Sequence, residues 1–359
     1  MSDSAGPGLK TAEIEGREMH CMDVLEAPVE VSGFPWLDLE RRFCRLPVDA
    51  LPDMSDSVRR LAWCTSGGRA RFRTDSGTIA IRVELAEVVD MPHMPRSGNS
   101  GFDIYVGSGT EKRFINAARP PQNERVYETL LVDGTDGGMR EWTLNFPVYN
   151  GVNQVVLGLD TGARIEPPSR FTVEKPLLFY GSSITHGGCA SRPGNTYPNI
   201  LSRWLDAKLI NFGFSGSARA EPAMARLIAT VDMRVFVMDY DHNAPTADYL
   251  EQTHEAFFRI VREAQPELPV VIVSSPSINA NPSRWMERRE IIRGTYENAL
   301  KRGDTRVWFV DGETLFGDSD QDACTVDGVH PNDLGFLRMA KAIRPSVETA
   351  LLAGNFECG

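Results

Sequence analysis

The stretch "LLFYGSSITHGG", residues 177–188, passes from a continuous apolar run into a loop of small and polar residues. Such a run, with no alternation of polar side chains, is typical of a strand buried on both faces of a parallel sheet. Four similar runs follow it, at residues 208–213, 234–240, 269–275 and 306–312. Segments with helical spacing of apolar residues separate these runs, and strands alternating with helices indicate right-handed βαβ crossovers. The carboxyl-terminal half is therefore predicted to be a three-layer α/β domain.

The amino-terminal half has a different rhythm, in which short β segments are broken by glycine, proline, asparagine and aspartate. In residues 78–88, Ile79, Ile81 and Val83 are predicted to point to one face of a strand. Similar segments occupy residues 102–108, 125–134, 140–149 and 153–160. This spacing predicts an antiparallel β-sandwich that resembles a jelly roll. We place it at residues 1–170, with a proline-rich and charged linker at about 163–176 and the α/β domain at 176–359.

The composition excludes several classes of protein. The chain has 359 residues and a net charge of −11, which disfavours binding to nucleic acid or to an anionic membrane. It has no apolar run long enough to span a membrane, and its first residues do not resemble a signal peptide. Its six cysteines form no closely spaced pairs, so we expect reduced thiols and no metal site. We expect a cytoplasmic protein without a cofactor, and homo-oligomer formation is left open.

Reactive residue types follow the predicted strands, where ligands bind in an open α/β sheet. Ser183 follows the first strand, Gly216 the second and Asn243 the third, while Asp327 and His330 follow the fifth. A serine hydrolase needs a nucleophile, a base, an acid that orients the base, and donors that face the developing oxyanion. The sequence supplies all of these residue types at the predicted strand ends. Nearby, His186, His242 and Cys189 lack metal-ligand spacing, and we expect them to line the pocket.

In this order, the residues resemble the conserved blocks of the SGNH (GDSL-type) hydrolases. The resemblance places the nucleophile at Ser183, with Ser182 where the family usually has aspartate. It also implies that His330 is the base and Asp327 its acid, because "DGVHP" matches the Asp-x-x-His-Pro block fully.

The oxyanion donors that the resemblance implies come from three places. They are the backbone N–H groups of Ser183 and Gly216 and the side-chain amide of Asn243, although "DYDHN" departs from the usual Gly-x-Asn-Asp. The α/β domain is then expected to be a flavodoxin-like α/β/α layer structure with a five-stranded parallel sheet in the order 2-1-3-4-5.

A second resemblance lies in the amino-terminal half. The sequence "GFDIY", residues 101–105, is similar to the Gly-x-Asp-Leu-Tyr motif of a subgroup whose members carry a β-rich domain before the hydrolase. With this motif, the resemblance extends over most of the chain.

We therefore expect a serine esterase that acts on a small-molecule ester with a short acyl group, such as an acetyl group on a sugar. The alternative is a catalytically weakened hydrolase scaffold that serves as a carbohydrate-binding or assembly protein, which the departures at Ser182 and in "DYDHN" motivate. A nucleotide-binding flavodoxin-like protein is disfavoured, because residues 181–188 lack the lysine of a P-loop.

Overall fold

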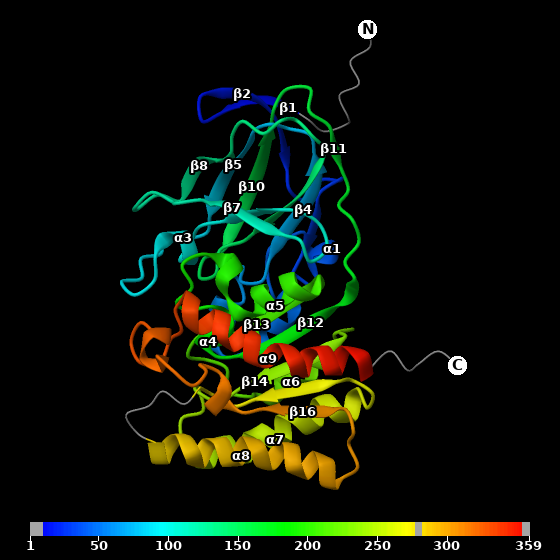
Figure 1. Cartoon of the computed structure of the whole chain (residues 1–359), viewed down its shortest axis with the longest axis vertical. Helices are drawn as coiled ribbons and strands as arrows, with labels where there is room; N and C mark the ends of the chain where they lie inside the picture. The colour runs from blue at the N-terminus through cyan, green and yellow to red at the C-terminus, as the bar shows by residue number, and fades with distance from the viewer. Residues whose placement is uncertain (1–9, 277–281, 354–359) are drawn as a thin grey trace, which may run out of the picture.

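The computed structural model describes residues 10–276 and 282–353. Two antiparallel sheets fill residues 10–166, called here the β half, and a parallel sheet with its helices fills residues 173–353, called here the α/β half. The β half lies above the α/β half in Figure 1. In the described part of the chain, no helix is both long enough and apolar enough to cross a membrane.

The β half is a sandwich of two sheets, as predicted. One sheet has the order β1 (Lys10–Ile14), β2 (Arg17–Asp23), β10 (Val152–Leu159), β5 (Ile79–Leu85) and β8 (Val126–Val132). The other has the order β11 (Ile165–Glu166), β4 (Arg69–Thr74), β9 (Arg140–Asn145), β6 (Asp103–Val106) and β7 (Arg113–Ala117), with β3 (Glu30–Ser32) also paired to β4. Ile79, Ile81 and Val83 are fully buried in one cluster with Phe72 and Trp142 of the second sheet. The predicted alternation of β5 is therefore confirmed.

The α/β half contains the predicted parallel sheet. It consists of β12 (Val173–Gly181), β13 (Ala207–Gly213), β14 (Val235–Asp239), β15 (Val270–Val273) and β16 (Val307–Val310). The spatial order is β13-β12-β14-β15-β16 and every pair is parallel, which confirms the order 2-1-3-4-5. Short elements follow the strands: α4 (Ser183–His186), η2 (Pro193–Asn195), η3 (Gly312–Thr314) and η4 (Gln321–Cys324).

Helices cover both faces of this sheet (Figure 1). On one face lie α5 (Tyr197–Leu205) and α9 (Asp333–Ala353), and on the other lie α6 (Pro222–Ile228), α7 (Ala247–Ala264) and α8 (Pro282–Lys301). The continuous apolar run of β12 follows from this arrangement. Leu177 and Phe179 pack under the first helix layer, whereas Leu178 and Tyr180 pack under the second.

Part of the amino-terminal half packs on the α/β half instead of on the sandwich. The β half also contains α1 (Leu37–Glu40), η1 (Val48–Asp53), α2 (Asp56–Leu61) and α3 (Arg96–Asn99). Leu51, Val58 and Leu61 of η1 and α2 belong to the apolar cluster of α6 and α7. The fully buried Arg45 donates hydrogen bonds of 2.8 and 2.7 Å to the carbonyls of Asn211 and Gly213 in β13. The two halves therefore share a core as well as a boundary.

The connection between the halves is shorter than the predicted linker at 163–176. Ile165 and Glu166 of β11 pair with Thr74 and Arg73 of β4, and β12 begins at Val173. Residues 167–172 therefore form the connection.

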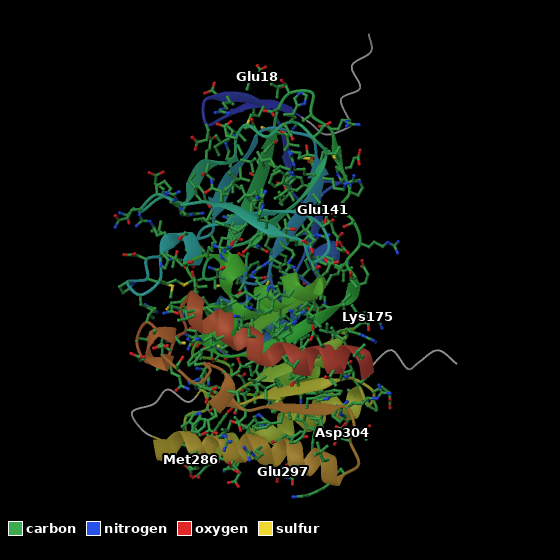
Figure 2. All side chains as sticks on the ribbon, viewed as in Figure 1. Glu18, Glu141, Lys175, Met286, Glu297 and Asp304 are labelled. Atoms are coloured by element: carbon green, nitrogen blue, oxygen red, sulfur yellow. The ribbon has the colours of Figure 1, made fainter. Side chains whose placement is uncertain are left out.

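The two halves meet through buried charged side chains. Figure 2 shows that side chains fill the region between the β half and the α/β half. Arg69 donates to Ser202 Oγ (2.8 Å) and Asn199 Oδ1 (3.0 Å), and burial lowers the pKa of its guanidinium to about 9. Lys112 forms an ion pair of 2.6 Å with Asp206, and both side chains are only 3% exposed. Since a buried charge is stable only with its partner in place, these contacts fix how the halves dock.

Candidate active site

The two serines of "GSSITHGG" lie at the sharp turn where β12 ends. Ser182 caps the short helix α4, because its Oγ accepts a hydrogen bond of 3.2 Å from the Ile184 N–H. Ser183 is the first residue of α4, and 7% of its surface is exposed. Gly181 permits the turn, since a Cβ there would lie 2.1 Å from Thr185 Oγ1. The adjacent serines therefore have different structural roles.

The side chains of Ser183, His330 and Asp327 form one chain of hydrogen bonds. Ser183 Oγ lies 2.9 Å from His330 Nε2, and His330 Nδ1 lies 2.7 Å from Asp327 Oδ2. A carboxylate can only accept, so Nδ1 carries the proton that bonds Asp327. In neutral His330, Nε2 is then the acceptor that faces the Ser183 hydroxyl. The structure thus brings together the three residues that the sequence placed in a triad.

Asp327 is held in its ionised form. Its partial burial opposes ionisation, but hydrogen bonds to the charged carboxylate outweigh that effect and lower its pKa to about 2. Besides the imidazole, the backbone N–H groups of His330 (2.7 Å) and Val329 (3.0 Å) both donate to Oδ1. These bonds leave Oδ2 directed at the ring, so the loop itself sets the orientation of the histidine.

The two other predicted site residues, Gly216 and Asn243, follow β13 and β14, the strands on either side of β12. Gly181 of β12 is in register with Gly213 of β13 and with Asp239 of β14. Gly216 and Asn243 follow those neighbouring strands within four residues, as Ser183 follows β12. All three segments therefore begin at one level of the sheet.

Gly216 has a φ of +68°, which glycine adopts without the strain of a side chain. A Cβ at Gly216 would meet no atom within 4 Å, so the backbone conformation is the reason for glycine here. The Oδ1 atom of Asn243 accepts a hydrogen bond of 3.3 Å from the Ala218 N–H. Because the amide oxygen is engaged, the NH₂ group of Asn243 is the end that can donate to a ligand.

A buried arginine that the sequence did not single out supports the Asn243 turn. Arg288 of α8 donates to the carbonyls of Asp241 (2.8 Å) and Ala244 (2.9 Å), and its Nε bonds the Asp241 carboxylate at 2.7 Å. Residues 241 and 244 flank Asn243 in the chain. No local pattern links Arg288 to that turn, because 44 or more residues separate them.

The expectation that His186 lines the pocket is wrong. His186 is fully buried, stacks on Tyr149 at 4.2 Å, and accepts the Ser215 N–H at Nδ1 (3.4 Å). Its Nε2–H therefore donates to the Val148 carbonyl (2.8 Å), and burial lowers the pKa of the ring well below its usual value. His186 is therefore a neutral, buried side chain that links α4 to the loop of Gly216 by a hydrogen bond.

Cys189 is likewise 4% exposed and belongs to a small apolar cluster with Met94 and Val148 of the β half. His242 is partly exposed. Among residues 10–276 and 282–353, no group of three or more histidine, cysteine or acidic side chains could hold a metal ion.

The β half also reaches the site. The Tyr149 hydroxyl donates to the Ser183 carbonyl at 3.4 Å, and the exposed ring of His93 lies 5.9 Å from the His330 ring. Neither residue carries a sequence signal, because each reaches the site only through the docking of the two halves.

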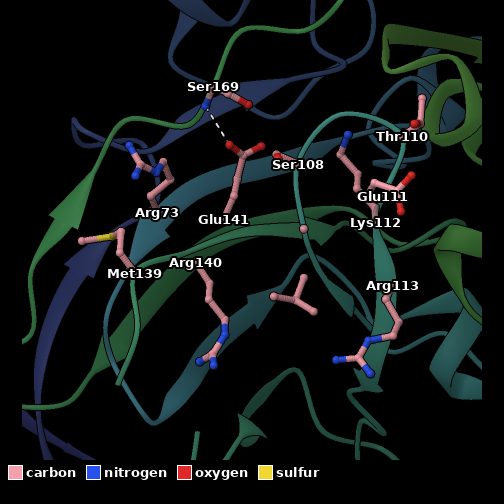
Figure 3. Close-up of a pocket in the computed structure, with 12 residues that line it drawn as sticks. Arg73, Ser108, Thr110, Glu111, Lys112, Arg113, Met139, Arg140, Glu141 and Ser169 are labelled. Carbon is pink, nitrogen blue, oxygen red and sulfur yellow. Dashed lines mark hydrogen bonds between the residues drawn. The ribbon is translucent and has the colours of Figure 1, made fainter. Parts of the chain in front are cut away.

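A hollow of about 900 Å³ lies elsewhere, on the β half (Figure 3). Its walls combine four basic and two acidic side chains: Arg73, Lys112, Arg113, Arg140, Glu111 and Glu141. None of the five predicted site residues lines it, and Glu141 is engaged with the Ser169 N–H and with Arg71. This hollow is therefore separate from the hydrogen-bonded triad.

Comparison with solved structures supports one fold for both halves. A protein from Bacteroides ovatus described as a GDSL-like lipase is 26% identical, with 93% of this chain and 98% of that chain covered and a TM-score of 0.85. The salicylyl-acyltransferase SsfX3 from a tetracycline biosynthetic pathway is 22% identical (92% and 97% covered, TM-score 0.74). An acetyl xylan esterase from Butyrivibrio proteoclasticus is 13% identical (94% and 100% covered, TM-score 0.57). At such identities the last two show only a shared fold.

Sequence comparison identifies the family. No curated protein sequence matches the chain significantly. The model of the GDSL-like lipase/acylhydrolase family matches residues 174–348, and the model of the GxDLY amino terminus of SGNH-hydrolase-type esterases matches residues 19–165. Both matches agree with the parallel α/β sheet and with the β half that precedes it. The chain therefore belongs to the SGNH (GDSL-type) superfamily of hydrolases that act on esters, in the subgroup with an amino-terminal GxDLY domain.

Proposed function

We propose that the protein is a serine esterase that hydrolyses short-chain carboxylic esters, acetyl esters of carbohydrates among them, through an acyl-enzyme. The observation that carries this proposal is the continuous hydrogen-bonded chain from Ser183 Oγ through His330 to Asp327, with distances of 2.9 and 2.7 Å. An activated serine needs a base within this reach and an acid that fixes the base.

The proposed reaction has two similar steps. In the first, His330 Nε2 takes the hydroxyl proton as Ser183 Oγ attacks the acyl carbon, and the imidazolium then returns that proton to the leaving alcohol. In the second, His330 takes a proton from water, the hydroxide attacks the acyl-enzyme, and Ser183 regains its proton as the acid leaves. Asp327, ionised because its pKa is about 2, stabilises the imidazolium in both steps. The N–H groups of Ser183 and Gly216 and the amide of Asn243 receive the oxyanion.

Two features support a short acyl group. Ser183 is only 7% exposed, and Tyr149, which packs against the apolar cluster of Cys189, donates a hydrogen bond to the Ser183 carbonyl. The acetyl xylan esterase with the same fold acts, by its name, on an acetylated sugar polymer. An acetyl group on a carbohydrate is therefore the substrate class we favour.

The alternative is a weakened scaffold that binds carbohydrate without hydrolysing esters. Ser182 motivated this alternative, because it replaces the usual aspartate. The Ser182 hydroxyl nevertheless caps α4, which is a role that an aspartate side chain can also fill. The hydrogen bond between Ser183 and His330 is also formed. Both observations favour a working hydrolase over the scaffold.

A panel of p-nitrophenyl esters with acyl chains of two to twelve carbons, tested alongside acetylated sugars, examines the proposal. We expect the highest kcat/KM at two to four carbons, and acid and alcohol released in equal amounts. Ser183→Ala is the matched control and should release neither product. Because a protein of this fold is an acyltransferase, alcohol release without free acid would indicate acyl transfer instead. Sugar binding without release of either product would support the scaffold.

A further inference from the structure

The aspartate of the "GFDIY" motif binds the α/β half. Asp103 is fully buried, and its Oδ1 accepts from Asn145 Nδ2 (2.8 Å) within the second sheet of the β half. Its Oδ2 accepts from Arg192 Nη1 (2.9 Å) and from the Gly194 N–H (2.8 Å), both in the α/β half. The Tyr105 hydroxyl of the same motif also accepts from Arg192. The motif is therefore a clamp on residues 192–194.

The clamped residues belong to the segment that follows the nucleophile. Residues 187–196, called here the clamp segment, connect α4 to α5. At its beginning, the N–H groups of Gly187 and Gly188 both donate to the Ser183 carbonyl at 2.9 Å. Any displacement of this segment is therefore transmitted to the backbone of Ser183.

The same segment also holds the loop of His330. The Cys189 N–H donates to the Pro331 carbonyl at 2.8 Å, and the Ser191 N–H donates to Asp333 Oδ1 at 2.9 Å. The Ser191 hydroxyl bonds the other oxygen of Asp333. These acceptors lie one and three residues after His330 in the chain, so the clamp segment spans both partners of the Ser183–His330 contact.

A second element of the β half lies against the segment. Ser97 of α3 donates from its hydroxyl to the Ser191 carbonyl at 2.7 Å. Gly98 approaches so closely that a Cβ there would lie 2.2 Å from the Ala190 carbonyl oxygen. The β half therefore contacts the segment on both sides of Ser191, through α3 and through the GFDIY motif.

We propose that Asp103 is a positioning residue for the esterase reaction. Through Arg192 and Gly194, it fixes the clamp segment and so sets the distance between Ser183 Oγ and His330 Nε2. This inference rests on the proposed function and assigns the GFDIY motif a role at the reaction site. A displacement of about 1 Å between reacting groups can cost about 100-fold in rate. A small shift of the clamp segment is therefore enough to affect turnover.

The test uses Asp103→Asn in the full chain. The amide has the shape of the carboxylate but lacks the charge that Arg192 requires. We expect kcat to fall about 10- to 100-fold with little change in KM. The rate at which a fluorophosphonate labels Ser183 should fall by the same factor. Arg192→Lys, which retains a cation for Asp103, should keep more of the labelling rate than Arg192→Met, and this pair supplies the test if Asp103→Asn does not fold.

Lys112→Met is the matched control. It breaks another buried ion pair between the halves, but its partner Asp206 lies beyond the end of α5, outside the clamp segment. It should lower the melting temperature and leave kcat per folded molecule unchanged. If both variants lose turnover equally, or if Asp103→Asn retains normal turnover, Asp103 does not position the site.

Hydrogen exchange separates this inference from the proposed function. Asp103→Asn should speed exchange at the Cys189 and Ser191 amides, whereas Lys112→Met should not. A wild-type protein with no ester hydrolysis and no label on Ser183 would refute the esterase, and exchange would still test the clamp. Unchanged exchange at both amides in Asp103→Asn would overturn the clamp whatever the reaction is.

Discussion

Ser183 Oγ and His330 Nε2 lie 2.9 Å apart although 147 positions separate the two residues in the chain. Ser183 begins the helix after the first strand of the parallel sheet, and His330 lies in the loop before the last helix. The contact therefore depends on the whole α/β half being folded.

Ser183→Ala should abolish ester hydrolysis, with kcat reduced on the order of 10⁶-fold, because it removes the hydroxyl that bonds His330 Nε2. Ser182→Ala should keep substantial activity and lose about 1 kcal/mol of stability, since only the cap of α4 is removed. Mass spectrometry after organophosphate treatment locates the reactive serine. A label on Ser182, or on neither serine, would contradict the assignment.

Asp327→Asn should lower kcat about 10³- to 10⁴-fold while the protein still folds, because an amide NH₂ would favour the wrong tautomer of His330. In the wild type, Asp327 stays ionised down to about pH 2, because its pKa is about 2, and it can therefore hold His330 in the reactive tautomer. Steady-state kinetics from pH 4 to 9 on both proteins measure these effects. An alanine or asparagine at 327 with wild-type turnover would remove Asp327 from the triad.

The lowered pKa of Asp327 also predicts how the melting temperature changes with pH. An aspartate with a folded pKa below its unfolded value of about 3.9 stabilises the protein above that value. The stabilisation is lost as the pH falls toward the folded pKa of about 2. Asp327→Asn should therefore lose less stability than the wild type between pH 4 and 2. Parallel melting curves for both proteins would argue against ionised Asp327 as a source of stability.

Asn243→Ala tests the oxyanion donor. If the amide donates to the oxyanion, kcat should fall about 100- to 1,000-fold with little change in KM. Asn243→Asp should be at least as damaging, since a carboxylate repels the developing charge. The Ala218 N–H loses its acceptor in the alanine variant, so the melting temperature is measured on the same samples. A variant that melts early but turns over normally would make Asn243 only a turn residue.

The raised pKa of the buried Asp239 predicts that the free energy of unfolding depends on pH. Burial raises its pKa to about 7, although the hydroxyls of Thr185 (2.8 Å) and Tyr197 (2.9 Å) donate to it and lower the pKa in opposition. Between about pH 4 and 7 the folded protein then binds a proton that the unfolded chain does not. The free energy of unfolding should therefore fall as pH rises through this range, by about 1 to 4 kcal/mol.

Urea denaturation at pH 5 and pH 8 measures that change, with Asp239→Asn as the comparison. The asparagine variant cannot ionise, so its stability should change less between the two pH values. Tyr197→Phe removes a donor to the carboxylate and should move the wild-type transition to higher pH. Equal pH dependence in all three proteins would show that Asp239 does not titrate in this range.

The sequence alone determined the elements that depend on local pattern. The continuous apolar run of β12 follows from burial on both faces, and the alternation of Ile79, Ile81 and Val83 follows from burial on one. The roles of Ser182 and of the Asp327–His330 loop could also be predicted from the sequence, because their hydrogen bonds join residues two or three positions apart. When two bonded residues are this close in the chain, their spacing in the sequence is enough to predict the contact.

Only the tertiary structure decided which distant side chains support these residues. Arg45 reaches β13, Arg288 holds the turn of Asn243, and Asp103 holds the segment after Ser183. The tertiary structure also showed that His186 is buried and hydrogen-bonded between two segments instead of lining a pocket. Each of these contacts joins residues from different elements, and its partner is fixed by how the layers pack. A buried charge looks like any other charge in the sequence, because the acceptors that stabilise it come together only when the chain folds.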